Sequence, residues 1–172
     1  MRSPLDDGES WELRGLRFEG TLELTLIELG PEAAPESPGL PALKQTPNPK
    51  TRLSDVVSEL LRSARRIVPV PNGRVVTVGF ERVLAHLVTD KACVADDKTE
   101  VVESPGRLRV LSRSRFLELF NASGLGPVVA GGPYLHYRVP TEGQLIDVIS
   151  TQPPRVTVRR GGVTLLSVVP RP

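Results

Sequence analysis

Apolar and polar residues alternate along the first part of the chain. From Trp11 to Phe18 the apolar positions are separated mainly by charged residues, and after Gly20 the alternation resumes from Thr21 to Leu26. A period of two places one set of side chains on the buried face of a strand and the other set in water. The pattern predicts a hairpin, or a long bent pair of strands, at the surface of a domain.

The spacing changes to that of a helix between Thr51 and Arg66. Apolar residues recur there at intervals of three and four, which places them on one helical face: Leu53, Val56, Val57, Leu60, Leu61 and Ala64. Asp55 near the start and Arg62, Arg65 and Arg66 near the end suit the helix dipole. The segment is predicted to be a helix that docks on a sheet.

Short runs that are rich in β-branched residues, alternate between apolar and polar residues, or flank a turn occupy much of the rest of the chain and predict strands. These runs are residues 74–80, 83–88, 107–111, 135–139, 145–149, 155–159 and 163–169. Residues 140–143 and 160–162 have turn sequences, so the strands on either side of each turn are expected to form a hairpin. The segment Ser112-Arg113-Ser114 is expected to cap a short helix that ends at Gly124.

Strands and helices do not alternate regularly, which argues against a doubly wound sheet. The predicted fold class is α+β, a mainly antiparallel sheet of about seven to nine strands with two helices packed against it. A length of 172 residues suits one domain, so residues 1–172 are predicted to form a single α+β domain. Six prolines within residues 30–50 exclude regular structure there and predict a surface loop, either functional or expendable.

Composition indicates a soluble protein of the cell interior. Hydrophobic residues make up 39% of the chain and charged residues 24%, as in ordinary globular domains. Cys93 is the single cysteine, so no disulfide can form within the chain. The first residues lack the apolar core of a signal peptide, and no stretch approaches the roughly 20 apolar residues of a membrane span. The predicted location is cytoplasmic.

Few residues could act as nucleophile or base, and they are Cys93, His86 and His136. The sequence permits a dyad of Cys93 with either histidine, but a lone cysteine is more often a small buried residue. Neither histidine has a neighbour at zinc-ligand spacing, and Asp96 and Asp97 lack the alternating carboxylates and the glycine of a calcium loop. The prediction is therefore no catalytic residue, no metal site and no cofactor.

Arginines gather in two segments and raise the alternative of nucleic-acid binding. They are Arg62, Arg65, Arg66, Arg107, Arg109, Arg113 and Arg115. Such side chains could line a phosphate-binding surface. The formal net charge is only +2, and aromatic residues make up 4% of the chain, so platforms for base stacking are scarce. Binding through Arg62, Arg65, Arg66, Arg113 and Arg115 is kept as an alternative.

Four segments carry motifs in a defined order. Residues 107–117 lead from a strand into a helix through Ser-Arg-Ser-Arg-Phe-Leu, residues 135–139 contain His-Tyr, and residues 145–150 contain Ile-Asp-Val. The strand at 83–88 completes the pattern, which covers roughly residues 53–155. In this pattern the chain resembles a group of small bacterial cytoplasmic proteins found near polymorphic toxin genes, among them immunity proteins. A cysteine or asparagine often found before Ile-Asp-Val is absent here. The resemblance implies a protein partner and brings no catalytic residues.

The leading functional prediction is a non-enzymatic protein-binding domain, an immunity protein that binds and neutralises a bacterial toxin. Immunity proteins against nucleases tend to be acidic, and this chain is not, so either the toxin is not a basic nuclease or the contact is local. The predicted local contact surface is Asp96, Asp97, Glu100 and Glu103. Two alternatives are left open: a nucleic-acid-associated accessory protein, and an enzyme of unrecognised type that uses His136, His86 or Cys93.

Overall fold

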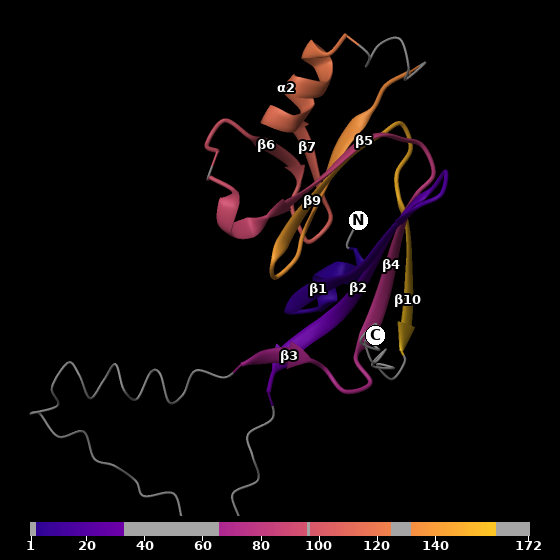
Figure 1. The fold of residues 1–172 in the computed structure, drawn as a ribbon, viewed down its shortest axis with the longest axis vertical. Helices are drawn as coiled ribbons and strands as arrows, with labels where there is room; N and C mark the ends of the chain where they lie inside the picture. Colours follow the sequence, from indigo (N-terminus) through magenta and orange to yellow (C-terminus); the bar gives the residue numbers. More distant parts are fainter. Residues whose placement is uncertain (1–2, 33–65, 96, 125–131, 161–172) are drawn as a thin grey trace, which may run out of the picture.

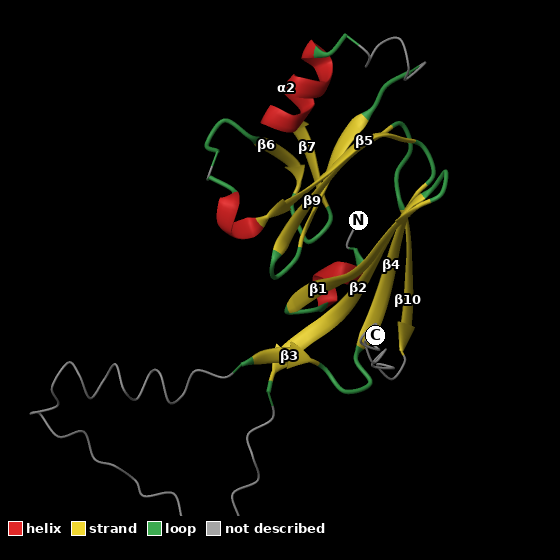
Figure 2. Cartoon of the chain, in the orientation of Figure 1, coloured by secondary structure: helices red, strands yellow, loops and turns green. Residues whose placement is uncertain are grey.

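The computed structural model is dominated by antiparallel strands (Figure 1). The structure describes residues 3–32, 66–95, 97–124 and 132–160. Within these residues the chain forms ten β-strands, one α-helix and two short 3₁₀ helices, and the strands belong to two antiparallel sheets (Figure 2). The α+β class and the mainly antiparallel pairing are confirmed.

Three predicted elements fall wholly or largely outside the described residues. They are the helix at 51–66, of which only Arg66 is described, the proline-rich loop at 30–50 beyond Glu32, and the strand at 163–169. These three predictions stay predictions.

The first sheet, sheet A, contains the N-terminal strands and the last described strand. Its members are β1 (Ser10–Phe18), β2 (Leu22–Pro31), β3 (Ile67–Pro69), β4 (Arg74–Phe80) and β10 (Arg155–Arg160). Their order is β1-β2-β4-β10, and β3 pairs with the last residues of β2. β1 and β2 form the predicted hairpin, which turns at Gly20 with a φ of 79°, a value that glycine adopts without strain.

The second sheet, sheet B, contains the middle of the chain. Its members, in spatial order, are β5 (Val83–Asp90), β9 (Gln144–Ser150), β8 (Leu135–Pro140), β7 (Arg109–Arg113) and β6 (Val101–Ser104). The 3₁₀ helix η2 (Lys91–Cys93) follows β5, and helix α2 (Arg115–Ala122) follows β7. Figure 1 shows α2 lying beside sheet B, on the side away from sheet A.

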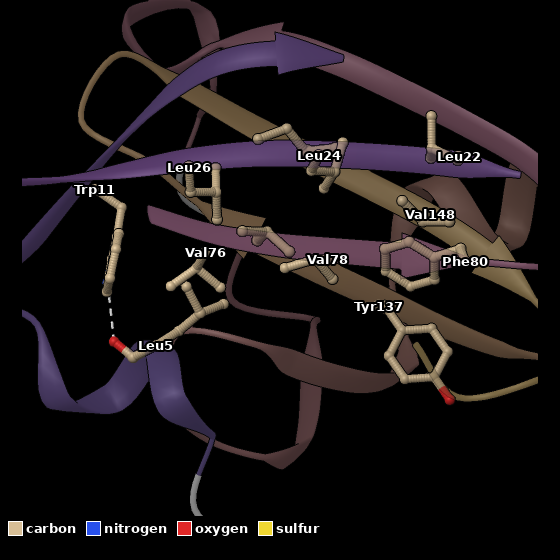
Figure 3. Close-up of a cluster of buried hydrophobic side chains, with 12 residues drawn as sticks. Leu5, Trp11, Leu22, Leu24, Leu26, Val76, Val78, Phe80, Tyr137 and Val148 are labelled. Carbon is tan, nitrogen blue, oxygen red and sulfur yellow. Dashed lines mark hydrogen bonds between the residues drawn. The ribbon is translucent and has the colours of Figure 1, made fainter. Parts of the chain in front are cut away.

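The two sheets face each other and enclose the main hydrophobic core (Figure 3). The buried core residues are Leu5, Trp11, Leu22, Leu24, Leu26, Val76, Val78, Phe80, Tyr137, Val139, Ile146 and Val148. The Phe80 and Tyr137 rings join the sheets, with centroids 5.6 Å apart. The short helix η1 (Pro4–Asp7) closes one end of the core, where Trp11 Nε1 donates to the Leu5 carbonyl at 2.9 Å.

The strand count and the number of sheets differ from the sequence prediction. The described residues contain ten strands in two sheets, where one sheet of about seven to nine strands was expected. β3 and β6 were not predicted, because three and four residues are too few for a period of two to be recognised. The second sheet arises at residues 81–82, where the chain leaves β4 in sheet A and enters β5 in sheet B.

One α-helix lies within the described residues, against two predicted, and it is the one expected after Ser112-Arg113-Ser114. The structure identifies Ser114 as the cap within that segment, since its side-chain oxygen accepts the Leu117 N–H at 3.1 Å. In the part of the chain that the structure describes, no helix is long and apolar enough to span a membrane.

Candidate functional site

The outer face of sheet B is polar where its inner face is apolar. On β8, Tyr137 and Val139 belong to the core between the sheets, so His136 and Arg138 point to the opposite face. Asp147 on β9 is the register partner of Arg138 and lies on that same outer face. The Phe116 ring of α2 packs edge-on against His136, with centroids 5.6 Å apart. Strand alternation therefore gathers three ionisable side chains beside α2.

These side chains belong to a hydrogen-bonded set that we call the polar network: Ser114, His136, Asp147, Arg138 and Glu100. Ser114 Oγ lies 2.7 Å from His136 Nδ1, and His136 Nε2 lies 2.8 Å from Asp147 Oδ1. Arg138 Nε donates to the same Asp147 oxygen at 2.6 Å. The Arg138 guanidinium also makes a two-point contact with Glu100, in which Nη2 donates to Oε1 at 2.9 Å. Ser114, His136 and Asp147 are each at most 3% exposed.

The protonation states in the polar network follow from these partners. Burial alone would raise the pKa of Asp147, but the hydrogen bonds from His136 and Arg138 outweigh burial and hold that pKa below its ordinary value. Burial alone would lower the pKa of Arg138, but Glu100 and Asp147 hold it above its ordinary value. An ionised carboxylate can only accept hydrogen bonds. His136 Nε2 therefore carries a hydrogen and donates a hydrogen bond to Asp147.

Serine, histidine and aspartate in this order are the components of a hydrolase triad. Here Ser114 Oγ is also the cap of α2, since it accepts the Leu117 N–H, and Ser114 is only 1% exposed. A nucleophile has to reach the reacting atom of a substrate, and this burial prevents it. In the structure the three residues connect the start of α2 to β8 and β9 by hydrogen bonds, which stabilises the position of the helix on the sheet.

An open cavity of about 350 Å³ lies beside the polar network, between α2, β5 and the segment that follows η2. We call it the α2 groove. Arg138 and Asp147 are among the residues that line it, together with three exposed apolar side chains. These three are Leu87 on β5, Val94 after η2 and Leu119 on α2, which are 44%, 40% and 69% exposed. The groove thus combines an apolar rim with charged groups that already have partners.

The four predicted acidic contact residues do not form a free acidic surface. Glu100 belongs to the polar network through Arg138, and Glu103 accepts a hydrogen bond from Ser112 Oγ at 2.5 Å. Asp97 Oδ2 lies 2.8 Å from Arg115 Nε, and hydrogen bonds from Thr99 hold the pKa of Asp97 below its ordinary value. Asp96 lies outside the described residues. The three described carboxylates are therefore engaged within the chain.

The predicted arginine surface is only partly described, and part of it is paired. Arg113 Nε lies 3.2 Å from Glu118 Oε1, and Arg115 pairs with Asp97. Arg66 immediately precedes β3, remote in sequence from these two, and its carbonyl accepts the Glu32 N–H at 2.8 Å. Arg62 and Arg65 lie outside the described residues. Both described arginines of the α2 region thus have an acidic neighbour.

The structure separates the candidates for a cysteine–histidine dyad. Both ring nitrogens of His136 are occupied, by Ser114 and Asp147. His86 lies on β5, with its ring centroid 5.6 Å from that of Phe18. Cys93 is exposed in η2 and lines the α2 groove, so it is not the small buried residue that a lone cysteine more often is. Among the described residues, no group of three or more histidine, cysteine or acidic side chains could hold a metal ion.

Sequence reasoning missed the polar network, although a signal for it was present. His136, Arg138 and Asp147 each stand among apolar neighbours in a strand that is otherwise buried. A polar residue at such a position must find a partner, because a buried polar group without one is costly. The signal did not identify the partners, since Glu100 is 38 positions from Arg138 and Ser114 is 22 positions from His136.

Comparison of this chain with models of protein families, with curated proteins and with solved structures finds no match.

Proposed function

We propose that this chain is a non-enzymatic protein-binding domain, an immunity protein that binds and neutralises a bacterial toxin through the α2 groove. The observation that supports the proposal is the apolar rim of that groove. Leu119 is 69% exposed on the one described α-helix, and Leu87 and Val94 are exposed on the other sides of the same cavity. Apolar side chains that gather around a concave surface are typical of a site that another molecule covers.

The energetics favour a protein partner over a reacting substrate. Covering a leucine completely stabilises a complex by on the order of 2 kcal/mol, so the three rim residues supply an apolar anchor. The ionisable groups beside the rim are committed to one another: Asp147 to His136 and Arg138, and Arg138 to Glu100. These groups stabilise the floor of the groove, and the free thiol of Cys93 lies beside them without a hydrogen-bonded base among the described residues.

The assignment to immunity proteins rests on the resemblance of residues 107–117 and of the His-Tyr and Ile-Asp-Val strands. The structure of the groove leads us to propose a contact surface other than the acidic residues expected from the sequence. Because Asp97, Glu100 and Glu103 are engaged within the chain, we place the contact on Leu87, Val94 and Leu119 instead of on the carboxylates. A partner that presents an apolar protrusion suits this rim better than a basic nuclease does.

Affinity purification of the tagged full chain from its native host, followed by mass spectrometry, tests the proposal. We expect one stoichiometric protein partner with the wild type and its loss with Leu119→Asp, which places a charge on the apolar rim. Leu135→Asp is the matched control, because Leu135 is 48% exposed at the start of β8 and does not line the groove. Circular dichroism of each variant checks that the fold is kept.

Each other outcome of the purification counts against the proposal. Recovery of the chain alone would contradict the proposed protein partner. Recovery of nucleic acid that nuclease treatment releases would instead support nucleic-acid binding by the arginine surface around Arg113 and Arg115. Equal loss of the partner in Leu119→Asp and Leu135→Asp removes the groove as the contact.

A further inference from the structure

Apart from the three-residue β3, the described parts of the two sheets end in four edge strands, and three of these carry features that oppose further strand pairing. β1 contains Glu12, Arg14 and Arg17 and has a register shift, and β10 contains Arg155, Arg159 and Arg160. β6 is only four residues long, contains Glu103 and pairs irregularly with β7. Charges, bulges and shortness are the usual means by which an edge strand avoids pairing with another chain.

The fourth edge strand, β5, lacks these features over most of its length. From Val83 to Thr89 it carries no lysine, arginine, aspartate, glutamate or proline. Its register shift is confined to the first residues, so regular pairing with β9 runs from Ala85 to Asp90. Among the described residues β5 pairs with β9 alone, which leaves its other side open. An edge of this kind is a template for strand addition.

Apolar side chains are exposed on both faces of this edge. Leu87 is the register partner of Asp147, so it lies on the outer face at the α2 groove, where it is 44% exposed. Val88 is the register partner of core residue Ile146, so it lies on the inner face, where it is 37% exposed. His86 shares that inner face with Val88 and is in contact with the ring of Phe18, which is 53% exposed. A strand added here would have to be apolar on both faces.

The backbone groups that such a strand would meet can be identified. The Lys91 N–H donates to the Gly143 carbonyl at 3.0 Å. Hydrogen-bonded pairs alternate along an antiparallel ladder, so Thr89 and Leu87, at steps of two from Lys91, direct their N–H and C=O groups toward β9. His86 and Val88 therefore direct theirs to the open side of β5.

We propose that two copies of this chain associate through β5, which pairs antiparallel with the β5 of the second copy about a two-fold axis at Leu87. The strand is its own complement, because it has no charged side chain from Val83 to Thr89 and exposes Leu87 on one face and Val88 on the other. This register places Leu87 opposite Leu87 and pairs the outward backbone groups of His86 with those of Val88 of the second copy. A two-fold axis requires this kind of self-complementary surface.

The charges at the two ends of the strand fit the same register. Glu81 and Arg82 precede β5, and Asp90 and Lys91 stand at its end. In the two-fold arrangement the start of one β5 lies beside the end of the other, so Arg82 is opposite Ala92 of the second copy and diagonal to its Asp90. Glu81, which also lies 3.5 Å from Arg155 of its own chain, is diagonal to Lys91 of the second copy. Each end thus places opposite charges at diagonal positions, which favours a second copy over an unrelated strand.

Association through β5 would also change the α2 groove. The two five-stranded B sheets would become one continuous sheet, with both grooves on its same outer face. Leu87, which lines the groove of its own copy, would then lie at the junction of the two grooves. The inference does not depend on the proposed function, since the chain can form this pair with or without a partner protein.

Sedimentation velocity of the full chain over a dilution series tests the inference. We expect wild type at twice the monomer mass, and Leu87→Lys to weaken the dimer by about a hundredfold, because it removes the central apolar contact and sets two like charges opposite each other. Val101→Lys is the matched control. Val101 is 45% exposed on β6, the opposite edge of the same sheet, so this variant should remain dimeric.

A second variant keeps the test decisive if Leu87→Lys disturbs the fold. Val88→Pro removes an N–H that points to the open side of β5, so it breaks the contact between copies and spares the ladder with β9. We expect a folded monomer, with folding checked by circular dichroism. A monomeric wild type at every concentration overturns the inference. A dimer that survives both β5 variants, or that Val101→Lys dissociates, overturns it as well.

Discussion

The two faces of sheet B are built from the same strands and are stabilised in different ways. On the inner face, Tyr137, Val139 and Val148 are closed off by apolar side chains of sheet A. On the outer face, one position along the same strands, His136, Arg138 and Asp147 are also buried, but each is held by hydrogen bonds. Contact between apolar surfaces tolerates small shifts, whereas hydrogen bonds require defined distances and directions.

The difference shows what each face contributes to the fold. A slip of β8 against the core by one residue would exchange its two faces and place His136 and Arg138 in the apolar interior. The polar network would lose its partners in the same step, and unpaired buried charges are strongly destabilising. The inner face therefore supplies most of the stability, and we infer that the outer face restricts the strands to one register.

The largest expected effect comes from truncation of the inner face. Phe80 is fully buried and its ring packs against Tyr137, so Phe80→Ala leaves a cavity and is expected to lower the free energy of unfolding by about 4 kcal/mol. Urea denaturation followed by fluorescence measures it. Phe18→Ala is the matched control, because Phe18 is 53% exposed, and its loss should stay below about 1 kcal/mol. Equal losses would show that Phe80 is not a core residue.

A smaller but still large effect is expected on the outer face. Asp147→Asn removes the charge that His136 and Arg138 share, and we expect a loss of about 3 kcal/mol in the free energy of unfolding, again measured by urea denaturation. Glu118→Gln is the control, since the exposed pair of Glu118 with Arg113 should be worth less than about 1 kcal/mol. Similar losses in both variants would contradict a special role for the buried pair.

The pH dependence of the stability lost in Asp147→Asn distinguishes the polar outer face of sheet B from its apolar inner face. The pKa of Asp147 is lowered in the folded state, so its ionised form contributes stability above the unfolded pKa of about 4, and that contribution is lost as the pH falls through the folded pKa. The advantage of wild type over Asp147→Asn should therefore be constant near neutral pH and shrink below about pH 4. Phe80→Ala should show no such convergence with wild type, because no titrating group is removed.

The smallest expected effect is at the end of the polar network. Ser114→Ala removes the cap of α2 and the partner of His136 Nδ1, so the free energy of unfolding should fall by about 1 kcal/mol. Ser112→Ala is a control two residues earlier, where the hydroxyl is exposed and donates to Glu103. Thermal melting followed by circular dichroism measures both. A neutral Ser114→Ala would show that the helix is held by its packing alone.

Local patterns along the sequence determined much of the secondary structure. The alternation from Trp11 to Leu26 predicted the hairpin of β1 and β2, and the segment Ser112-Arg113-Ser114 predicted the start of α2. These features depend on residues a few positions apart, so they can be recognised without a fold. β3 and β6 were missed because strands of three and four residues depend on their neighbours in the sheet for their existence.

The tertiary structure alone decided what the polar and exposed residues do. Glu100 meets Arg138 across 38 positions of the chain, and Leu87, Val94 and Leu119 come from separate elements to form one rim. The sequence determined that His136 and Asp147 lie in strands rich in apolar residues, and so that they need partners. Which partners they find depends on strand register and sheet order, and these are set by long-range burial that no local pattern encodes.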